Sequence, residues 1–273
     1  MHKEDRKGDA MGKYLEGRRF GYLTPETDGG FYKGIQNQQV SGYPIGIVYI
    51  ENVNYPLIPG NVVNAYTYNF PVRMKPVPNL TNDRLFNNDP TIVDDLIKTV
   101  KSLVEDDGCR AISGACGFFG NYQQQVRAAV DVPVGLSSLV QIPFIQSLIK
   151  PGQKIGILTA NKGSLTDSLL HSCGVADTSN LVVKDALQTE EFATVVNMRG
   201  YFDNTIARQE ILNLAQELID ENDDLGAILL ECSDMPPYAS EIQRVTQLPV
   251  FDFITLINWL KSGVAQHPYS GWV

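Results

Sequence analysis

The sequence predicts an α/β protein in which 273 residues form two similar halves, each with a mostly parallel sheet flanked by helices. Strand-like apolar runs alternate with amphipathic helical stretches, which is typical of parallel sheets. Two segments also repeat one arrangement, an apolar run followed by a cysteine and then a turn. They are CRAISGACGFFG, from Cys109 to Gly120, and AILLECSDMPPY, from Ala227 to Tyr238. We call them the first and second cysteine segments.

Composition excludes several classes of protein. With 43% hydrophobic residues the chain can bury a large core, and its net charge of −9 disfavours nucleic acid and anionic membranes as partners. We expect a small-molecule substrate, and a homo-oligomer is compatible with these data. Four cysteines without paired spacing favour a reducing compartment. Because we find neither a secretory signal nor an apolar run of roughly 18 residues, we expect a cytoplasmic protein without a membrane partner.

The first half begins with an expected mobile arm, residues 1–18, and a strand from Arg19 to Thr24. A second strand lies within PIGIVYIENV, residues 44–53. Residues 55–90 are rich in proline and asparagine, which predicts an irregular functional loop or lid. Some of its side chains are long enough to reach a carboxylate, although surface positions are the simpler interpretation: Tyr66, Tyr68, Arg73 and Lys75. An amphipathic helix from Thr91 to Asp106 then leads to the first cysteine segment.

The remaining elements continue the alternation. After the first cysteine segment we expect, in order, a helix at 121–130, a strand at 132–135, a helix at 139–149, a strand at 154–159, a helix at 164–172, a strand at 181–184 and helices at 189–199 and 205–222. Helices at 238–246 and 254–261 follow the second cysteine segment. We place the first lobe at residues 19–134 plus 252–273, and the second lobe at residues 135–251.

Cys116 and Cys232 are the candidate functional residues. A buried cysteine is usually a small hydrophobe, but two thiols at equivalent strand ends, where α/β sheets bind ligands, indicate catalysis. Cys109 and Cys173 are assigned to packing. The glycines beside Cys116 allow backbone N–H groups to point at a ligand, and we expect them to lower the thiol pKa from about 8.5 towards neutrality. Three scattered histidines make a metal site or a Ser-His-Asp triad improbable.

With these segments, most of the chain resembles the aspartate/glutamate/hydantoin racemase superfamily. KIGILTANKGSLTDSLL is similar to the opening of its second lobe, and LPVFDFITLINWL to its last strand and closing helix. The resemblance implies two pseudo-symmetric lobes that face an active-site cleft. Many members have Cys-Asn-Thr at the first cysteine, where this chain has Cys-Gly-Phe, and the usual Asp-Ser or Gly-Gly-Met-Gly start is replaced by FGYLTPETDGG. At Cys232 the sequence Cys-Ser-Asp is closer to the family's Cys-Thr-Glu or Cys-Thr-His.

The function that the resemblance implies is a racemase or epimerase without PLP or any other cofactor. Cys116 and Cys232 would exchange a proton on opposite faces of a carbon next to a carboxylate or carbonyl, in an aspartate-, glutamate- or hydantoin-type substrate. Asp234 is the expected auxiliary base, or else a helix cap. Phe118 and Phe119 favour a less polar pocket unless they face the core. The expected substrate-binding residues are Thr24, Glu26, Asn52, Gly117, Phe118, Phe119, Asn161 and Ser233.

Two alternatives remain open. Related enzymes use cysteine for cis-trans isomerisation or for decarboxylation of a small carboxylic acid, although the presence of both cysteines disfavours a one-cysteine decarboxylase. Two α/β lobes are also compatible with a non-catalytic protein that binds a small ligand.

Overall fold

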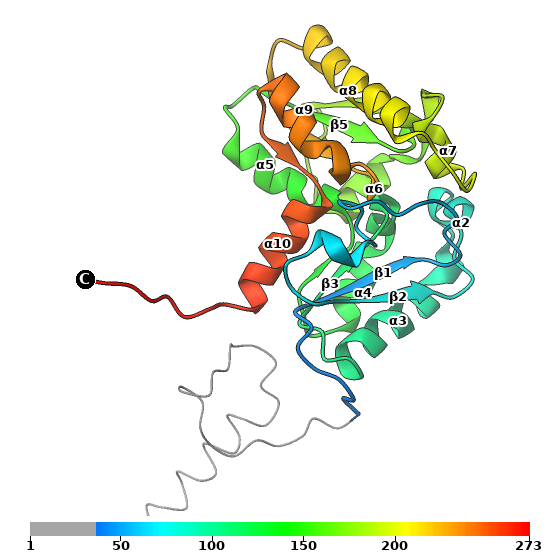
Figure 1. Ribbon diagram of the computed structural model, residues 1–273, viewed down its shortest axis with the longest axis vertical. Helices are drawn as coiled ribbons and strands as arrows, with labels where there is room; N and C mark the ends of the chain where they lie inside the picture. Colours follow the sequence, from blue (N-terminus) through cyan, green and yellow to red (C-terminus); the bar gives the residue numbers. More distant parts are fainter. Residues whose placement is uncertain (1–36) are drawn as a thin grey trace, which may run out of the picture.

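The computed structural model describes residues 37–273, which form two parallel four-stranded sheets with helices packed around them (Figure 1). The predicted α/β fold is therefore confirmed. The expected arm and first strand, Arg19 to Thr24, lie outside the described residues. Within residues 37–273, no helix is both long enough and apolar enough to cross a membrane.

The first sheet is covered by helices on both faces. Its strands, in spatial order, are β2 (Val72–Val77), β1 (Ile45–Ile50), β3 (Ala111–Gly114) and β4 (Val134–Gly135). Ile45 and Ile47 pack with α10 (Phe253–Val264), whereas Val48 and Ile50 face the core that includes α3 (Val93–Glu105). Both faces of β1 are buried, and for this reason its sequence is a continuous apolar run.

The second sheet repeats this order. Its strands are β6 (Leu181–Asp185), β5 (Lys154–Thr159), β7 (Leu225–Leu230) and β8 (Val250–Phe251). In each sheet the first strand along the chain pairs with the second and the third, and the fourth extends the third. The helices of this half are α5 (Ile142–Leu148), α6 (Asp167–Ser172), α7 (Phe192–Val196), α8 (Asn204–Glu221) and α9 (Ala239–Thr246).

The shared topology places the two cysteine segments at equivalent positions. Each follows the third strand of its sheet, β3 or β7. The N–H of Ala115 donates to the carbonyl of Val48 at 2.9 Å, and the N–H of Glu231 donates to the carbonyl of Leu158 at 2.8 Å. Residues 115–118 therefore correspond one by one to residues 231–234. Both stretches lie at carboxyl strand ends, where open α/β sheets bind ligands.

The prediction of an irregular region at residues 55–90 is wrong in part. It contains strand β2 and the short helix α2 (Asn82–Phe86). Strand β2 has a neighbour on one side only, so its sequence VRMKPV includes a proline and two charges that a central strand would exclude. Arg73 and Lys75 form ion pairs with Asp107 at 3.2 and 2.5 Å, close to Cys109, and do not point to Cys116 or Cys232.

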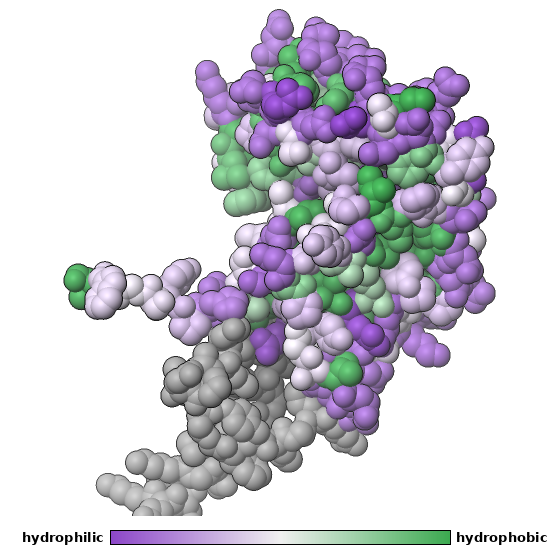
Figure 2. All heavy atoms as spheres, viewed as in Figure 1, coloured by the Kyte–Doolittle hydropathy of each residue, from purple (hydrophilic) through white to green (hydrophobic). Residues whose placement is uncertain are grey.

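In the view of Figure 2 the outer surface is mainly polar, and hydrophobic residues gather where the halves meet and over α5. Figure 2 shows hydrophilic residues over most of the outer helices and a cluster of hydrophobic residues between the two lobes in this view. Figure 1 shows α2 of the first half next to α7 of the second along this junction. The polypeptide between β1 and α2 also crosses this junction, because the N–H of Val62 donates to the carbonyl of Ser233 at 3.3 Å.

Candidate active site

A pocket lies between the two sheets at their carboxyl edges and includes both cysteine segments. It contains about 500 Å³ of empty space, part of it open to solvent. The lining side chains are mainly aromatic, aliphatic and acidic, and they come from both halves: Tyr49, Ile50, Val53, Tyr55, Val63, Asn82, Phe86, Ala115, Cys116, Gly117, Phe118, Ala160, Val195, Val196, Glu231, Cys232, Ser233 and Asp234. Thus Cys116 and Cys232 lie in one pocket, together with Asp234.

The two cysteines are held in similar ways by the backbone. The backbone N–H of Phe118 lowers the pKa of the Cys116 thiol, and the backbone N–H of Asp234 does the same for Cys232. The hydroxyl of Ser233 donates to the carbonyl of Ala115 at 3.1 Å and thereby links the two cysteine segments directly. Two strand ends from separate sheets are therefore held together at the base of the pocket.

The expected lowering of the thiol pKa is wrong. Burial raises the pKa of Cys116 well above its usual value, and the neighbouring Glu231 and Asp234 raise it further. Burial likewise raises the pKa of Cys232, again with Asp234 and Glu231. The backbone N–H donors act in the opposite direction but are the weaker influence. Both cysteines are therefore neutral thiols near neutral pH when no ligand is bound.

Asp234 is connected to three donors. Its Oδ1 accepts from the hydroxyl of Tyr55 at 2.9 Å and from the amide of Asn61, and its Oδ2 accepts from the thiol of Cys232 at 3.5 Å. Burial raises the pKa of Asp234, while these hydrogen bonds lower it. The carboxylate is thus placed to take a proton from Cys232. It is not the N-cap of α9, because Tyr238 occupies that position.

Tyr55 and Asn61 were not expected from the sequence. Both lie in the stretch between β1 and α2, where we singled out Tyr66, Tyr68, Arg73 and Lys75 instead. Tyr66 is 90% exposed, and the hydroxyl of Tyr68 donates to the carbonyl of Val62 at 2.8 Å. The Asn-Val-Val-Asn turn at residues 61–64 gives no local signal of which side chain faces the site, because Asp234, the partner of Asn61, is 173 positions away.

Glu231 is a second carboxylate in the pocket that sequence reasoning missed. Its side chain is fully buried, and its Oε2 accepts from the hydroxyl of Thr159 at 2.9 Å and from the N–H of Ala160 at 3.1 Å. Burial raises its pKa to about 7. The available signal was a glutamate at the end of the apolar run AILL, since an ionisable residue rarely ends a buried strand without a partner or a role.

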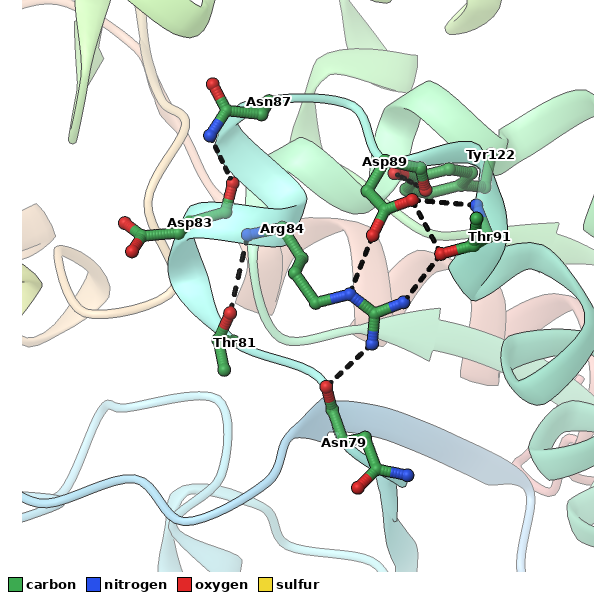
Figure 3. Close-up of polar contacts among 8 residues, drawn as sticks. All are labelled: Asn79, Thr81, Asp83, Arg84, Asn87, Asp89, Thr91 and Tyr122. Carbon is green, nitrogen blue, oxygen red and sulfur yellow. Dashed lines mark hydrogen bonds and ion pairs between the residues drawn. The ribbon is translucent and has the colours of Figure 1, made fainter.

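Helix α2 brings Asn82 and Phe86 to the pocket, and a polar network around Arg84 fixes its position (Figure 3). The Arg84 guanidinium donates to Asp89 at 2.7 Å, to Thr91 at 2.9 Å and to the carbonyl of Asn79 at 2.7 Å. These contacts direct Arg84 away from the pocket. On the other side of α2, the Asn82 amide donates to the carbonyl of Val196 in α7 at 2.7 Å.

The expected substrate-binding residues are only partly brought together. Gly117, Phe118 and Ser233 line the pocket, although the Ser233 hydroxyl is already engaged. Three others lie elsewhere: Asn52 is exposed, Phe119 is buried in the core, and the Asn161 side chain caps the turn at Lys162–Ser164. Thr24 and Glu26 lie outside the described residues.

The charge of the pocket is unusual for an enzyme that acts on amino dicarboxylates. Among the described residues that line it there are two carboxylates, two tyrosines and two phenylalanines, but no lysine, arginine or histidine. Within residues 37–273, no three His, Cys, Asp or Glu side chains are grouped so that they could hold a metal ion. The pocket therefore presents acidic and aromatic groups, which favour a ligand that carries positive charge.

Comparison with known proteins identifies two kinds of relative. The chain is 30% identical over 267 residues to dimethylsulfoniopropionate lyase 7 of Emiliania huxleyi, covering 94% of this chain and 76% of that protein. It is 29% identical over 233 residues to the dimethylsulfoniopropionate lyase of a clade D Durusdinium species, covering 83% and 77%. No family model matches the chain.

Among solved structures, the allantoin racemase of Pseudomonas fluorescens has a TM-score of 0.57 at 14% identity, with 84% of this chain and 100% of that chain covered. The glutamate racemase of Bacillus anthracis has a TM-score of 0.52 at 14% identity, with 82% and 85% covered. The expected resemblance to the aspartate/glutamate/hydantoin racemase superfamily is therefore confirmed at the level of the fold.

The protein is an enzyme, but the expected racemase activity is wrong. The curated sequences that match most of the chain are lyases, whereas the likeness to racemases is one of fold at low sequence identity. These findings fit the alternative hypothesis, a cysteine-dependent cis-trans isomerase or decarboxylase of a small carboxylic acid, better than they fit a racemase. The resemblance predicted the fold correctly, but the function was inferred too narrowly from it.

Proposed function

The chain belongs to the dimethylsulfoniopropionate lyase family, and from this premise we propose that it cleaves dimethylsulfoniopropionate. This molecule carries a dimethylsulfonium cation and a carboxylate, separated by two carbons. A lyase breaks a bond by elimination and forms a double bond. Removal of a proton next to the carboxylate, with loss of the sulfonium group from the neighbouring carbon, yields acrylate and dimethyl sulfide.

The observation that carries this proposal is the charge of the pocket. Glu231 and Asp234 lie beside the thiols, and no basic side chain is among the described residues that line the pocket. Such a site repels a second carboxylate but attracts a sulfonium ion, which can also pack against aromatic rings. Aspartate would bring two carboxylates against this lining, whereas dimethylsulfoniopropionate brings only one.

Cys232 is the proposed base. Its thiol donates to Asp234 at 3.5 Å, so the carboxylate can accept that proton and leave a thiolate. The sulfonium charge would stabilise this ionisation, offsetting the burial and the two carboxylates that raise the pKa of the free thiol. Tyr55 and Asn61 hold Asp234 in position by donating hydrogen bonds to its Oδ1.

The proposed step balances as follows. The Cys232 thiolate takes the α-proton, the electrons of that C–H bond form the double bond, and the electron pair of the C–S bond leaves with dimethyl sulfide. Cys232 is then a thiol again, and Asp234 releases the proton it accepted to water. The net products are acrylate, dimethyl sulfide and one proton. The product carbons are planar, so no second base is needed, and Cys116 has a lesser part as a wall of the pocket.

The test is direct. Purified protein is incubated with dimethylsulfoniopropionate, dimethyl sulfide is measured in the headspace by gas chromatography, and acrylate is measured by NMR. We expect equal amounts of the two products. As a matched comparison, L-aspartate and allantoin in D2O should show no faster α-deuteration than in buffer alone. Folded protein that forms neither acrylate nor dimethyl sulfide would disprove the proposal.

A further inference from the structure

One carboxylate oxygen of Glu231 accepts hydrogen bonds, and the other has no partner among the described residues. Its side chain has no exposed surface, and Oε2 accepts two hydrogen bonds, from Thr159 and Ala160. Its other oxygen, Oε1, is buried and has no hydrogen-bond partner among the described residues. Buried polar atoms are nearly always partnered, so an orphan oxygen in a ligand pocket indicates a group that the ligand satisfies.

The free oxygen lies against the turn after Cys116. A methyl group added at Gly117 would be 1.7 Å from Oε1, so any larger residue there would force the turn or the carboxylate to move. Both Glu231 and Phe118 line the pocket, and the Phe118 ring meets the Phe86 ring edge to face with centroids 4.9 Å apart. The pocket that contains Glu231 thus has an aromatic wall formed by Phe86 and Phe118.

The two carboxylates of the pocket differ in how many hydrogen bonds stabilise their negative charge. Asp234 accepts from three side chains, Tyr55, Asn61 and Cys232, so its charge is distributed over hydrogen bonds. Glu231 receives donors on one oxygen only. Without a ligand, its remaining oxygen must be protonated or must carry an uncompensated buried charge, which is strongly unfavourable.

We propose that the free oxygen of Glu231 selects the cationic end of the substrate. The positively polarised methyl groups of the sulfonium would contact Oε1 on one side and the rings of Phe86 and Phe118 on the other. This inference rests on the proposed function and specifies which residue distinguishes a sulfonium from an uncharged group of the same shape. Glu231 is thus a specificity-determining residue, whereas Cys232 and Asp234 handle the proton.

Such a contact makes binding depend on pH. Burial raises the pKa of Glu231 to about 7, so the free enzyme holds a neutral glutamic acid below that pH, and a cation must displace its proton. The titratable groups that face it are Cys116, Cys173, Cys232 and Asp234, whose pKa values are also raised. Affinity for a cationic ligand should fall as pH decreases through about 7, while affinity for an uncharged isostere should change less.

The experiment compares two unreactive ligands by calorimetry: the trimethylammonium analogue of the substrate, and its isostere in which carbon replaces the nitrogen. We expect wild-type protein to prefer the cation and Glu231→Gln to lose about tenfold or more of that preference. Glu221→Gln removes the same charge from an exposed residue of α8, where Glu221 pairs with Lys184, and should keep the preference.

The outcomes separate this inference from the proposed function, because binding is measured without turnover. A cation preference that persists in Glu231→Gln, or that is absent in the wild type, overturns the inference even if the protein cleaves dimethylsulfoniopropionate. A preference that depends on Glu231 in a protein that does not cleave it supports the inference and rejects the proposed reaction. Should the variant not fold, the wild type decides: a cation preference that is equal at about pH 8 and about pH 6 overturns the inference, because protonation of Glu231 would remove the charge that the cation contacts, and one that weakens at pH 6 supports it.

Discussion

Residues 115–118 and 231–234 occupy the same place in the two sheets, yet they surround their cysteines with different side chains. Ala115 precedes the first cysteine where Glu231 precedes the second, and Gly117 corresponds to Ser233. Phe118 corresponds to Asp234. The repeated topology thus gives the two segments the same place in their sheets. Differences at three positions make the surroundings of Cys116 apolar and those of Cys232 acidic.

This difference has a chemical meaning. A racemase needs a base on each face of the substrate carbon, and two similar thiols serve that need. An elimination needs one base and a place for the leaving group, so unequal surroundings are an advantage. The carboxylate that can accept a proton lies beside Cys232, whereas the side chain at the equivalent position after Cys116 is a phenylalanine. The two cysteines can therefore be tested against each other.

The largest expected effect is the difference between Cys232→Ser and Cys116→Ser. Loss of the base at Cys232 should lower kcat by roughly a thousandfold, because a serine hydroxyl is a far weaker acid than a thiol and is a poor proton acceptor here. Cys116→Ser should lower kcat by only about tenfold, a loss of roughly 1.4 kcal/mol of transition-state stabilisation. Initial rates of acrylate formation at saturating substrate measure both, with circular dichroism as the check on folding. A greater loss at Cys116 would reverse the assignment.

The next effect concerns Asp234→Asn, which keeps the shape and removes the charge. We expect kcat to fall by roughly a hundredfold, within the range for a group that assists proton transfer. Burial raises the pKa of Asp234, and the residue must be ionised to accept the thiol proton, so wild-type activity should be lost as pH falls through that raised pKa. The variant should lack this acid limb in kcat, measured at saturating substrate so that weaker binding through Glu231 does not contribute. A pH–rate profile that keeps the limb unchanged would exclude Asp234 from the proton path.

A smaller effect is expected at Gly117, the position equivalent to Ser233. In Gly117→Ala the new methyl group would lie 1.7 Å from Glu231 Oε1 and 2.4 Å from its Cδ, so the turn or the carboxylate must move. We expect the free energy of unfolding to fall by about 1–3 kcal/mol, with a raised KM. Gly263→Ala is the matched control, because a methyl group there meets no atom within 4 Å. Thermal unfolding of both variants tests this, and equal Tm values would contradict it.

The smallest effect is expected for Ser233→Ala. It removes the hydroxyl that donates to the carbonyl of Ala115 at 3.1 Å and leaves that buried acceptor without this donor. The free energy of unfolding should fall by about 1 kcal/mol, the usual value for one such hydrogen bond. Urea denaturation measures the change, and Ser262→Ala, at an exposed hydroxyl on α10, should have a smaller effect. If the two variants lose equal stability, the bond between the cysteine segments contributes little.

The sequence was sufficient to predict the fold of the molecule but not the chemistry of its pocket. Apolar runs predicted β1, β5 and β7, and they placed both cysteines at strand ends, because burial on two faces leaves a strong local signal. Strand β2 was not predicted, because it is an edge strand and its sequence contains a proline and charged residues that weaken the strand pattern.

The acid groups around the thiols could not be assigned in the same way. The pKa of the Cys116 thiol was predicted too low. A glycine-rich turn indicates backbone donors that lower the pKa, whereas Glu231, which raises it, comes from the other sheet and leaves no signal near Cys116 in the sequence. The role of Asn61 depends on a loop that crosses between the halves. Such contacts between distant residues have no local pattern.

The hydrogen bond from Asn82 to the carbonyl of Val196 has a consequence for how substrate enters and products leave. It joins α2 of one half to α7 of the other, and both residues line the pocket. At the cysteines the halves are tied by Ser233 and Val62, so the two lobes are expected to hinge there and to part between α2 and α7. Hydrogen–deuterium exchange should therefore be faster in these two short helices than in β3 and β7, and Asn82→Ala should increase it further.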